Sequence, residues 1–348
     1  MAWAQEAFSS AEMKIDVDQI KRVLIIQLRP FGDVLLNTAY LPFLRKRLPD
    51  ARIDFLVKHP YQHVLDNNPH VDRCVVLEEK QSRSAWLERM RLFLNVRKGR
   101  YDLVIDQIQG TTSAQIVFFS GAPFRIASNE ARWRFLYNIT VPYQGKRYSA
   151  SMKFDLLQPL GIREAAYTLD YTIHAASDAY IQRWLQDRSL EGTPFICISP
   201  GSPRPKKKWD ASCYAELADL IYEKLNRPVV LLWGPNEKRD AETVCRRMKQ
   251  PALLAPPTDF NQAAAMLKAC GLLVCNDGGL NHLSVATHTP SLAIFGHTSP
   301  VTWSPGTVFP LHHHLYNPDG QKQSDHQFGI TPIQAFEKVN AILKSCRS

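Results

Sequence analysis

The chain has 348 residues, 45% of them hydrophobic and 22% charged, which is long enough for two α/β domains with a core each. This composition, without biased repeats, excludes a disordered or fibrous protein. The net charge of +9 at pH 7 predicts an anionic partner, and charge alone leaves nucleic acid, an anionic membrane and a phosphorylated ligand open.

The first 20 residues are expected to form an N-terminal extension. They lack the basic start and continuous apolar core of a secretory signal, and no apolar run reaches the length of a transmembrane helix. We therefore expect a cytoplasmic protein. Its seven cysteines are scattered without the spacing of a zinc site, as expected for reduced thiols.

In the first half of the chain, short apolar runs alternate with helical patterns, which predicts βαβ units and a parallel sheet. The expected strands are residues 22–28, 52–57, 74–77 and 101–107, and the expected helices are 34–48 and 85–98. Residues 148–160 predict a helix that ends at Gly161, and the alternating stretch 167–174 predicts a strand.

The second half repeats the alternation and predicts a second α/β sheet. The expected strands are residues 195–199, 228–233, 272–275 and 291–295, and the expected helices are 211–225, 236–249, 263–270 and 280–286. The last helical stretch, 332–343, could pack on either domain. We place the boundary near residues 160–175, with one domain over 21–165 and the other over 166–348.

Parallel α/β sheets bind ligands at the carboxyl ends of their strands. The first such junction, residues 29–33, contains one glycine, Gly32, where a dinucleotide-binding loop has three, which disfavours an NAD site. Asp33 is either an N-cap, which stabilises a helix by about 1 kcal/mol, or a general base for a sugar hydroxyl. Position alone favours the N-cap.

The second junction follows strand 195–199 and contains Ser202, Arg204 and the lysines 206–208. Beside a helix start, these residues form either a diphosphate clamp or an ordinary solvated loop. Carboxylates placed like Glu237, after strand 228–232, often bind ribose hydroxyls, although an exposed glutamate at a helix start is equally natural.

The third junction is Asn276-Asp277-Gly278-Gly279, between strand 272–275 and helix 280–286. Paired glycines at a helix N-terminus allow an anion to approach, so this loop predicts a phosphate site, with a tight turn capped by Asp277 as the alternative. His282 is by default a packed histidine. The triplet His312–His314 has no neighbouring carboxylate or cysteine in sequence, which disfavours a metal site.

Together and in this order, these motifs resemble the bacterial lipopolysaccharide heptosyltransferases, the ADP-heptose-using glycosyltransferase family 9. The resemblance runs from about residue 21 to the C-terminus. It rests on Gly32-Asp33, Lys207-Lys208-Trp209, Trp233-Gly234-Pro235-Asn236-Glu237, the segment 277–282, Thr289-Pro290 and Phe295-Gly296.

The resemblance implies an α/β protein of the GT-B fold, with two Rossmann-like lobes and a cleft between them. The N-terminal lobe would bind the acceptor, an inner-core saccharide of lipopolysaccharide, and the C-terminal lobe would bind ADP-heptose. Transfer would invert the anomeric carbon and would need no metal or other cofactor.

The family's functional residues also carry over by motif. Asp33 matches the general base and Lys207 the phosphate-contacting lysine. The remaining donor-binding matches are Ser202, Glu237, Asp277, Gly278, Gly279, Leu280 and His282. The family more often has serine or threonine in place of Gly278, so one hydroxyl donor to the phosphates is missing here.

Basic residues of the N-terminal lobe suit a phosphorylated, lipid-linked acceptor and peripheral contact with the inner face of the inner membrane. The expected acceptor contacts are Arg29, Lys58 and Arg125, supported by Arg132, Arg134, Lys146 and Arg147. The alternatives are another nucleotide sugar, a protein acceptor and a non-catalytic nucleotide-binding relative. Nucleic-acid binding is disfavoured because no recognised motif accompanies the charge.

Overall fold

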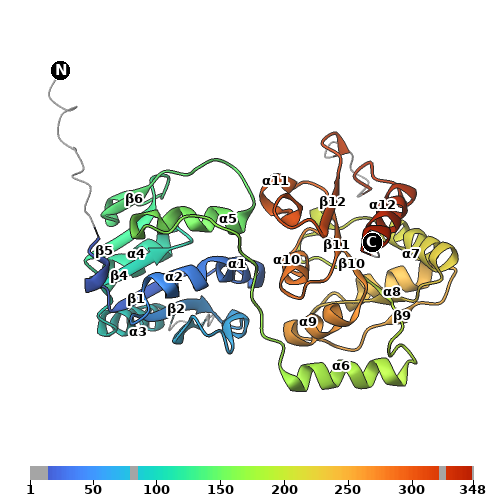
Figure 1. The fold of residues 1–348 in the computed structure, drawn as a ribbon, viewed down its shortest axis with the longest axis horizontal. Helices are drawn as coiled ribbons and strands as arrows, with labels where there is room; N and C mark the ends of the chain where they lie inside the picture. The colour runs from blue at the N-terminus through green and yellow to red at the C-terminus, as the bar shows by residue number, and fades with distance from the viewer. Residues whose placement is uncertain (1–14, 79–84, 321–326, 347–348) are drawn as a thin grey trace. The chain divides into compact units, whose positions relative to one another are not determined.

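The computed structural model describes residues 15–78, 85–320 and 327–346, so most of the predicted N-terminal extension lies outside the described residues. The chain divides into two compact units (Figure 1). Unit 1 comprises Met1–Gly145 and Ala150–Tyr167, and unit 2 comprises Lys146–Ser149 and Thr168–Ser348. Each unit contains a parallel sheet with helices, which confirms the predicted α/β class.

The sheet of unit 1 has the strand order β3-β2-β1-β4-β5-β6, and all its neighbouring strands are parallel. Its strands are β1 (Arg22–Ile26), β2 (Arg52–Lys58), β3 (Arg73–Leu77), β4 (Leu103–Asp106), β5 (Phe124–Ser128) and β6 (Ile139–Val141). The order reverses between β1 and β4, which is the switch point where such sheets bind ligands.

The helices of unit 1 confirm the predicted helical segments, with 34–48 and 148–160 each divided into shorter pieces. They are α1 (Phe31–Leu36), η2 (Asn37–Tyr40), α2 (Leu41–Arg47), α3 (Ala85–Lys98), α4 (Thr111–Ser120), α5 (Ser149–Lys153) and η5 (Phe154–Leu160), with shorter turns η1 (Val17–Gln19), η3 (Tyr61–Leu65) and η4 (Arg134–Leu136). Residues 34–48 form three pieces because Pro42 begins a new helix at α2. Gly161 ends η5 with φ of 75°, as the sequence predicted.

The sheet of unit 2 has the order β12-β11-β10-β7-β8-β9 and is also parallel throughout. Its strands are β7 (Ile196–Ser199), β8 (Val229–Leu231), β9 (Leu253–Leu254), β10 (Leu272–Asn276), β11 (Ser291–Phe295) and β12 (His312–Tyr316). Its helices are α6 (Ala175–Asp187), α7 (Ala211–Leu225), α8 (Lys238–Arg247), α9 (Phe260–Ala269), α10 (Gly279–Ala286), α11 (Pro300–Trp303) and α12 (Pro332–Ser345), with turns η6 (Pro205–Lys207) and η7 (Pro305–Thr307). The last helix, α12, packs against α7.

The predicted strand at residues 167–174 is wrong. This stretch pairs with no described strand, and its last residues bond to the side chain of Asn261 instead. The Asn261 amide accepts a hydrogen bond from the backbone N–H of His174 at 2.9 Å and donates one to the carbonyl of Thr172 at 2.8 Å. The alternation in sequence reflects the burial of Leu169 and Tyr171.

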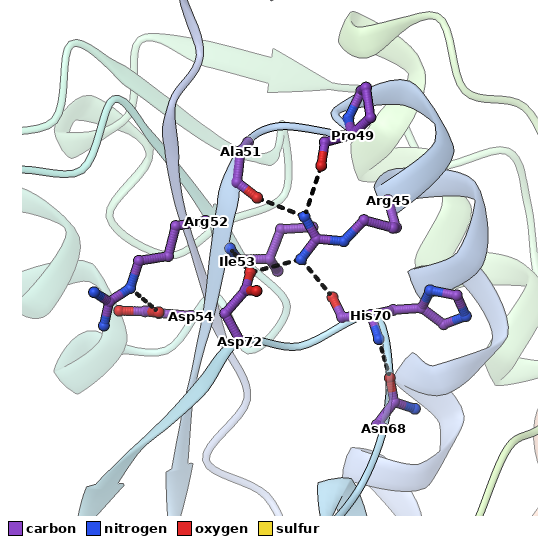
Figure 2. A network of polar contacts seen from close by, with 9 residues as sticks. All are labelled: Arg45, Pro49, Ala51, Arg52, Ile53, Asp54, Asn68, His70 and Asp72. Atoms are coloured by element: carbon purple, nitrogen blue, oxygen red, sulfur yellow. Dashed lines mark hydrogen bonds and ion pairs between the residues drawn. The ribbon is translucent and has the colours of Figure 1, made fainter.

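Some basic side chains of unit 1 form ion pairs within the fold (Figure 2). The guanidinium of Arg45 donates to the Asp72 carboxylate at 2.6 Å and to the Ala51 carbonyl at 2.6 Å. Arg52 donates to the buried Asp54 at 2.8 Å. The contacts of Arg45 connect the end of α2 to the chain at the start of β2 and β3. Arg45 and Arg52 therefore neutralise carboxylates of the protein itself.

Among the described residues, no helix is both long and apolar enough to cross a membrane.

Candidate functional site

Four loops of unit 2 meet at the carboxyl edge of its sheet. They follow β7, β8, β10 and β11, and because these strands are parallel, their carboxyl ends lie at one edge. The first three loops carry every donor-binding residue that the sequence predicted.

Asn276, the last residue of β10, ties two of these loops together. Its side-chain oxygen accepts hydrogen bonds from the backbone N–H of Trp209 at 2.9 Å and the hydroxyl of Tyr214 at 3.0 Å. Its amide donates to the carbonyls of Pro200 at 2.9 Å and Gly201 at 3.2 Å. The loop after β7 is therefore held in a fixed position beside the loop after β10.

Asp277 is buried at the centre of this edge, with 3% of its side chain exposed. Its carboxylate accepts hydrogen bonds from the ammonium of Lys207 and from the hydroxyl of Thr298 at 2.6 Å. It does not cap α10, because the N-cap residue is Gly278 and makes no side-chain capping bond. Asp277 therefore organises the loop and fixes the Lys207 ammonium at the edge of the sheet.

The three successive lysines have different roles. Lys207 turns to Asp277, whereas Lys208 donates to Asp240 of α8 at 2.6 Å and Lys206 is exposed. Ser202, buried in the same loop, accepts a hydrogen bond from the backbone N–H of Arg204 at 3.3 Å. The structure thus brings one of the three lysines to the predicted phosphate site.

Glu237 is the N-cap residue of α8, as the alternative interpretation had it, but its side chain is partly buried and makes no capping hydrogen bond. Its carboxylate accepts a hydrogen bond from the backbone N–H of Gly234 at 3.3 Å, and burial raises its pKa. The side chain lies so close to Gly201 that a Cβ atom there would be 2.5 Å from Oε2 of Glu237. Glycine at position 201 therefore lets Glu237 lie across the loop after β7.

The N-terminus of α10 presents Gly278, Gly279 and Leu280, all partly exposed, next to Asp277. One turn further, Nδ1 of His282 lies 2.9 Å from the hydroxyl of Tyr148, and the ring is buried. The predicted donor loop is thus the start of an eight-residue helix whose free N–H groups favour an anion.

We expect Gly278→Ser to be tolerated and to tighten nucleotide diphosphate binding about tenfold to a hundredfold, by adding one hydrogen bond to a charged group. A Cβ atom at Gly278 meets nothing nearer than 3.9 Å, and the backbone there is extended with φ of −177°. Isothermal titration with ADP checks this prediction, and Gly278→Ala separates the hydroxyl from the added carbon. Equal affinity of the serine and alanine variants would contradict it.

In unit 1, Asp33 lies on the first turn of α1, directly after β1. The N-cap of this helix is Pro30, so the capping interpretation of Asp33 is wrong. Its Oδ1 atom is buried and accepts no hydrogen bond from the described residues, and the guanidinium of Arg29 lies 3.7 Å from it.

Lys153 is a buried cation near Asp33 that the sequence did not single out. Its side chain donates to the carbonyl of Gln107 at 3.4 Å, and burial lowers its pKa to about 8, although the nearby Asp33 carboxylate acts in the opposite direction. In sequence it is one lysine in a helical pattern, and only its burial against Gln107, the residue after β4, distinguishes it.

The predicted acceptor contacts separate into two groups. Arg29 follows β1 and Lys58 ends β2, so both lie at the same edge as Asp33. Arg125 lies near the beginning of β5, where its guanidinium donates to the carbonyls of Ala122 at 2.6 Å and Leu136 at 2.9 Å. The structure does not bring Arg125 to the edge where Arg29 and Lys58 lie.

The histidine triplet forms the first three residues of β12. His312 is buried against the hydroxyl of Ser291 at 2.9 Å, and His314 contacts the hydroxyl of Ser304 at 2.9 Å. Within the described ranges, no group of three histidine, cysteine or carboxylate side chains is arranged to hold a metal ion. The side chains of His312 and His314 have structural partners.

Known proteins resemble this chain over most of its length. Lipopolysaccharide heptosyltransferase 2 of Escherichia coli strain K12 is 27% identical, with 92% of this chain and 98% of the relative covered. Among solved structures, a family 9 glycosyl transferase from Veillonella parvula matches with a TM-score of 0.82 and 22% identity, covering 93% of this chain and 97% of that one. The E. coli ADP-heptose LPS heptosyltransferase II matches with a TM-score of 0.77 and 22% identity, covering 94% and 100%. These structures confirm the predicted GT-B fold.

The family model for glycosyltransferase family 9 (heptosyltransferase) matches residues 89–327, more than half of the chain. That range contains the loops of Lys207, Glu237 and Asp277, and the strand order of both sheets is that of a doubly wound α/β fold. The chain is therefore a glycosyltransferase and belongs to family 9, the heptosyltransferases.

Proposed function

We propose that this enzyme transfers a heptose from ADP-heptose to an inner-core saccharide of lipopolysaccharide, with inversion and without a metal ion. The observation that carries this proposal is the buried Asp277 that holds Lys207 beside the N-terminus of α10. A fixed ammonium group and free helix N–H groups provide the charge that stabilises a departing diphosphate. The two E. coli relatives are named as lipopolysaccharide heptosyltransferases, and the name of one includes ADP-heptose.

In this proposal, unit 2 binds the donor and Asp33 of unit 1 accepts the proton of the attacking hydroxyl. The bond from the acceptor oxygen to the anomeric carbon forms while the bond from that carbon to the diphosphate breaks. Glu237 binds the ribose, and its half-buried carboxylate suits hydroxyl ligands. The negative charge that develops on the leaving ADP is stabilised by Lys207 and by the backbone of Gly278 and Gly279.

The acceptor is proposed to be anionic and lipid-linked, bound in part by Arg29 and Lys58, with the protein in peripheral contact with the inner face of the inner membrane. Arg29 supports this assignment because 54% of its side chain is exposed beside Asp33. A guanidinium in that place binds a phosphate or a carboxylate while leaving the base free.

A thermal-shift panel with ADP-, UDP- and GDP-linked sugars tests the donor assignment. We expect ADP-heptose to raise the melting temperature most, since a ligand present at 100 times its Kd stabilises the fold by about 2.7 kcal/mol. ADP alone should give most of that shift, because the diphosphate makes the charged contacts. Stabilisation by UDP- or GDP-sugars alone would contradict the donor assignment. Loss of the ADP-induced rise in melting temperature on adding EDTA would contradict transfer without a metal ion.

A further inference from the structure

Most of the large apolar side chains that are exposed in the described part of unit 1 gather on one layer of that unit. The helices α3 and α4 and the turn η4 cover the same face of the sheet, where Val96, Val117 and Tyr137 pack in one core cluster with Leu24 and Val104. Helix α4 contacts both α3 and η4. We call the outer surface of Ala85–Lys98, Thr111–Ser120 and residues 129–136 the α3–α4–η4 face.

Large apolar side chains are exposed to solvent on all three elements of this face. The most exposed is Phe135, at 80%. The others are Leu87, Leu94, Phe118 and Phe119. Single exposed apolar residues are normal on a protein surface, but five on three adjacent elements mark a contact site.

Neighbouring rings hold two of these side chains in place. Phe119 stacks on the buried Phe93 with 4.6 Å between ring centroids, and Phe135 stacks on Trp133 with 6.3 Å. The backbone N–H of Leu136 donates to the carbonyl of Trp133 at 3.0 Å, and Arg125 donates to the carbonyl of Leu136, which fixes the turn below Phe135. Little conformational entropy is therefore lost when these rings enter an apolar medium.

The charges around these rings are mainly positive. Six basic side chains on the face are exposed, against two carboxylates, Glu88 and Glu130, which gives a net charge of +4. The basic residues are Arg89, Arg91, Arg97, Lys98, Arg132 and Arg134. Helix α4, which carries Phe118 and Phe119, has no charged residue.

We propose that the α3–α4–η4 face docks on an anionic lipid bilayer. Phenylalanine and leucine side chains enter the boundary between headgroups and acyl chains, and the arginines and Lys98 bind the headgroup phosphates. A polyanion such as RNA would satisfy the charges and leave Phe135 in water, whereas a bilayer accommodates both. The inference deepens the proposed function and rests on it in one respect, since a lipid-linked acceptor requires the enzyme at a membrane.

Co-sedimentation of the full chain with vesicles tests the proposal without donor or acceptor, so its result is independent of heptose transfer. We expect binding to phosphatidylglycerol–phosphatidylethanolamine vesicles and little binding to phosphatidylcholine vesicles. Phe118→Ser/Phe135→Ser should lower the partition coefficient about tenfold or more, as expected for removing two buried rings. Arg91→Gln/Arg134→Gln should lower it about tenfold or more, since each basic group near the surface contributes about fivefold.

Matched changes in unit 2 serve as controls. Ile333 on α12 is 57% exposed, close to the 55% of Phe118, and Arg239 and Arg246 are exposed on α8. We expect Ile333→Ser and Arg239→Gln/Arg246→Gln to leave vesicle binding unchanged, and all variants to keep the parent's melting temperature and ADP shift.

Absence of vesicle binding, equal binding to phosphatidylcholine, or equal losses in the control variants would overturn the proposal. So would a dimer in light scattering that the Phe118→Ser/Phe135→Ser change dissociates, because the face would then join two copies of the chain.

Discussion

Replacing Asp33 by asparagine is expected to lower kcat for sugar transfer about a thousandfold, which is within the usual contribution of a general base. Asparagine has nearly the same shape but cannot accept the proton of the attacking hydroxyl. The change removes a carboxylate whose Oδ1 accepts no hydrogen bond from the described residues, so the free energy of unfolding should change by less than about 1 kcal/mol. Kinetics with saturating donor and acceptor measure the effect.

Asp178 offers a matched control, because it is also an aspartate in the first turn of a helix, α6. Asp178→Asn should leave kcat within twofold of the parent. The Asp33→Asn variant should also keep the ADP-induced rise in melting temperature, since unit 2 carries the donor loops. An unchanged rate for Asp33→Asn would show that Asp33 is not the base and would favour a nucleotide-binding protein without transferase activity.

Replacing Lys207 by methionine is expected to lower kcat/KM about a hundredfold to a thousandfold, as when one stabilising donor is lost from a transition state. The same change should lower the free energy of unfolding by about 3 kcal/mol, because the buried Asp277 carboxylate loses its charged partner. Thr298 would remain as a neutral donor to that carboxylate at 2.6 Å. Urea denaturation and steady-state kinetics give the two quantities separately.

The double variant Lys207→Met/Asp277→Asn separates the two roles of Lys207. It removes the uncompensated charge, so most of the lost stability should return while the rate stays low. Recovery of the rate together with the stability would show that Lys207 acts only by holding Asp277. Lys206→Met is the control, because this neighbouring lysine is exposed, and its rate should change less than twofold.

The helices and strands that were predicted correctly were predicted from patterns within a single short segment of the sequence. Helix α3 begins and ends where the sequence predicted, and β10 and β11 follow their apolar runs, because strands covered on both faces need apolar side chains at every position. Residues 167–174 gave an equally local signal, an alternation of apolar and polar residues, and form no strand. A strand also requires a neighbouring edge, and sequence alternation carries no information about that edge.

In the candidate site, too, local sequence signals were predictable and contacts between distant residues were not. Asp33, Lys207, Glu237 and Asp277 became candidates because each follows a strand, and in a parallel sheet that position faces the ligand edge. The family resemblance then suggested their roles. Their partners were not predictable, because they come from distant parts of the chain. Lys153 packs near Asp33 from 120 positions further along, and Thr298 donates to Asp277 from the loop after β11.

By itself, the sequence determined the fold class, the strand-to-loop junctions and the family, since these depend on local periodicity and on motifs of a few residues. Only the tertiary structure decided which lysine of 206–208 meets Asp277 and that Asp33 does not cap its helix. It also placed Arg125 on backbone carbonyls and gathered the side chains of Leu94, Phe118 and Phe135 on one face. Each of these outcomes depends on where side chains distant in sequence meet in three dimensions, which is set by the packing of helices on the sheets.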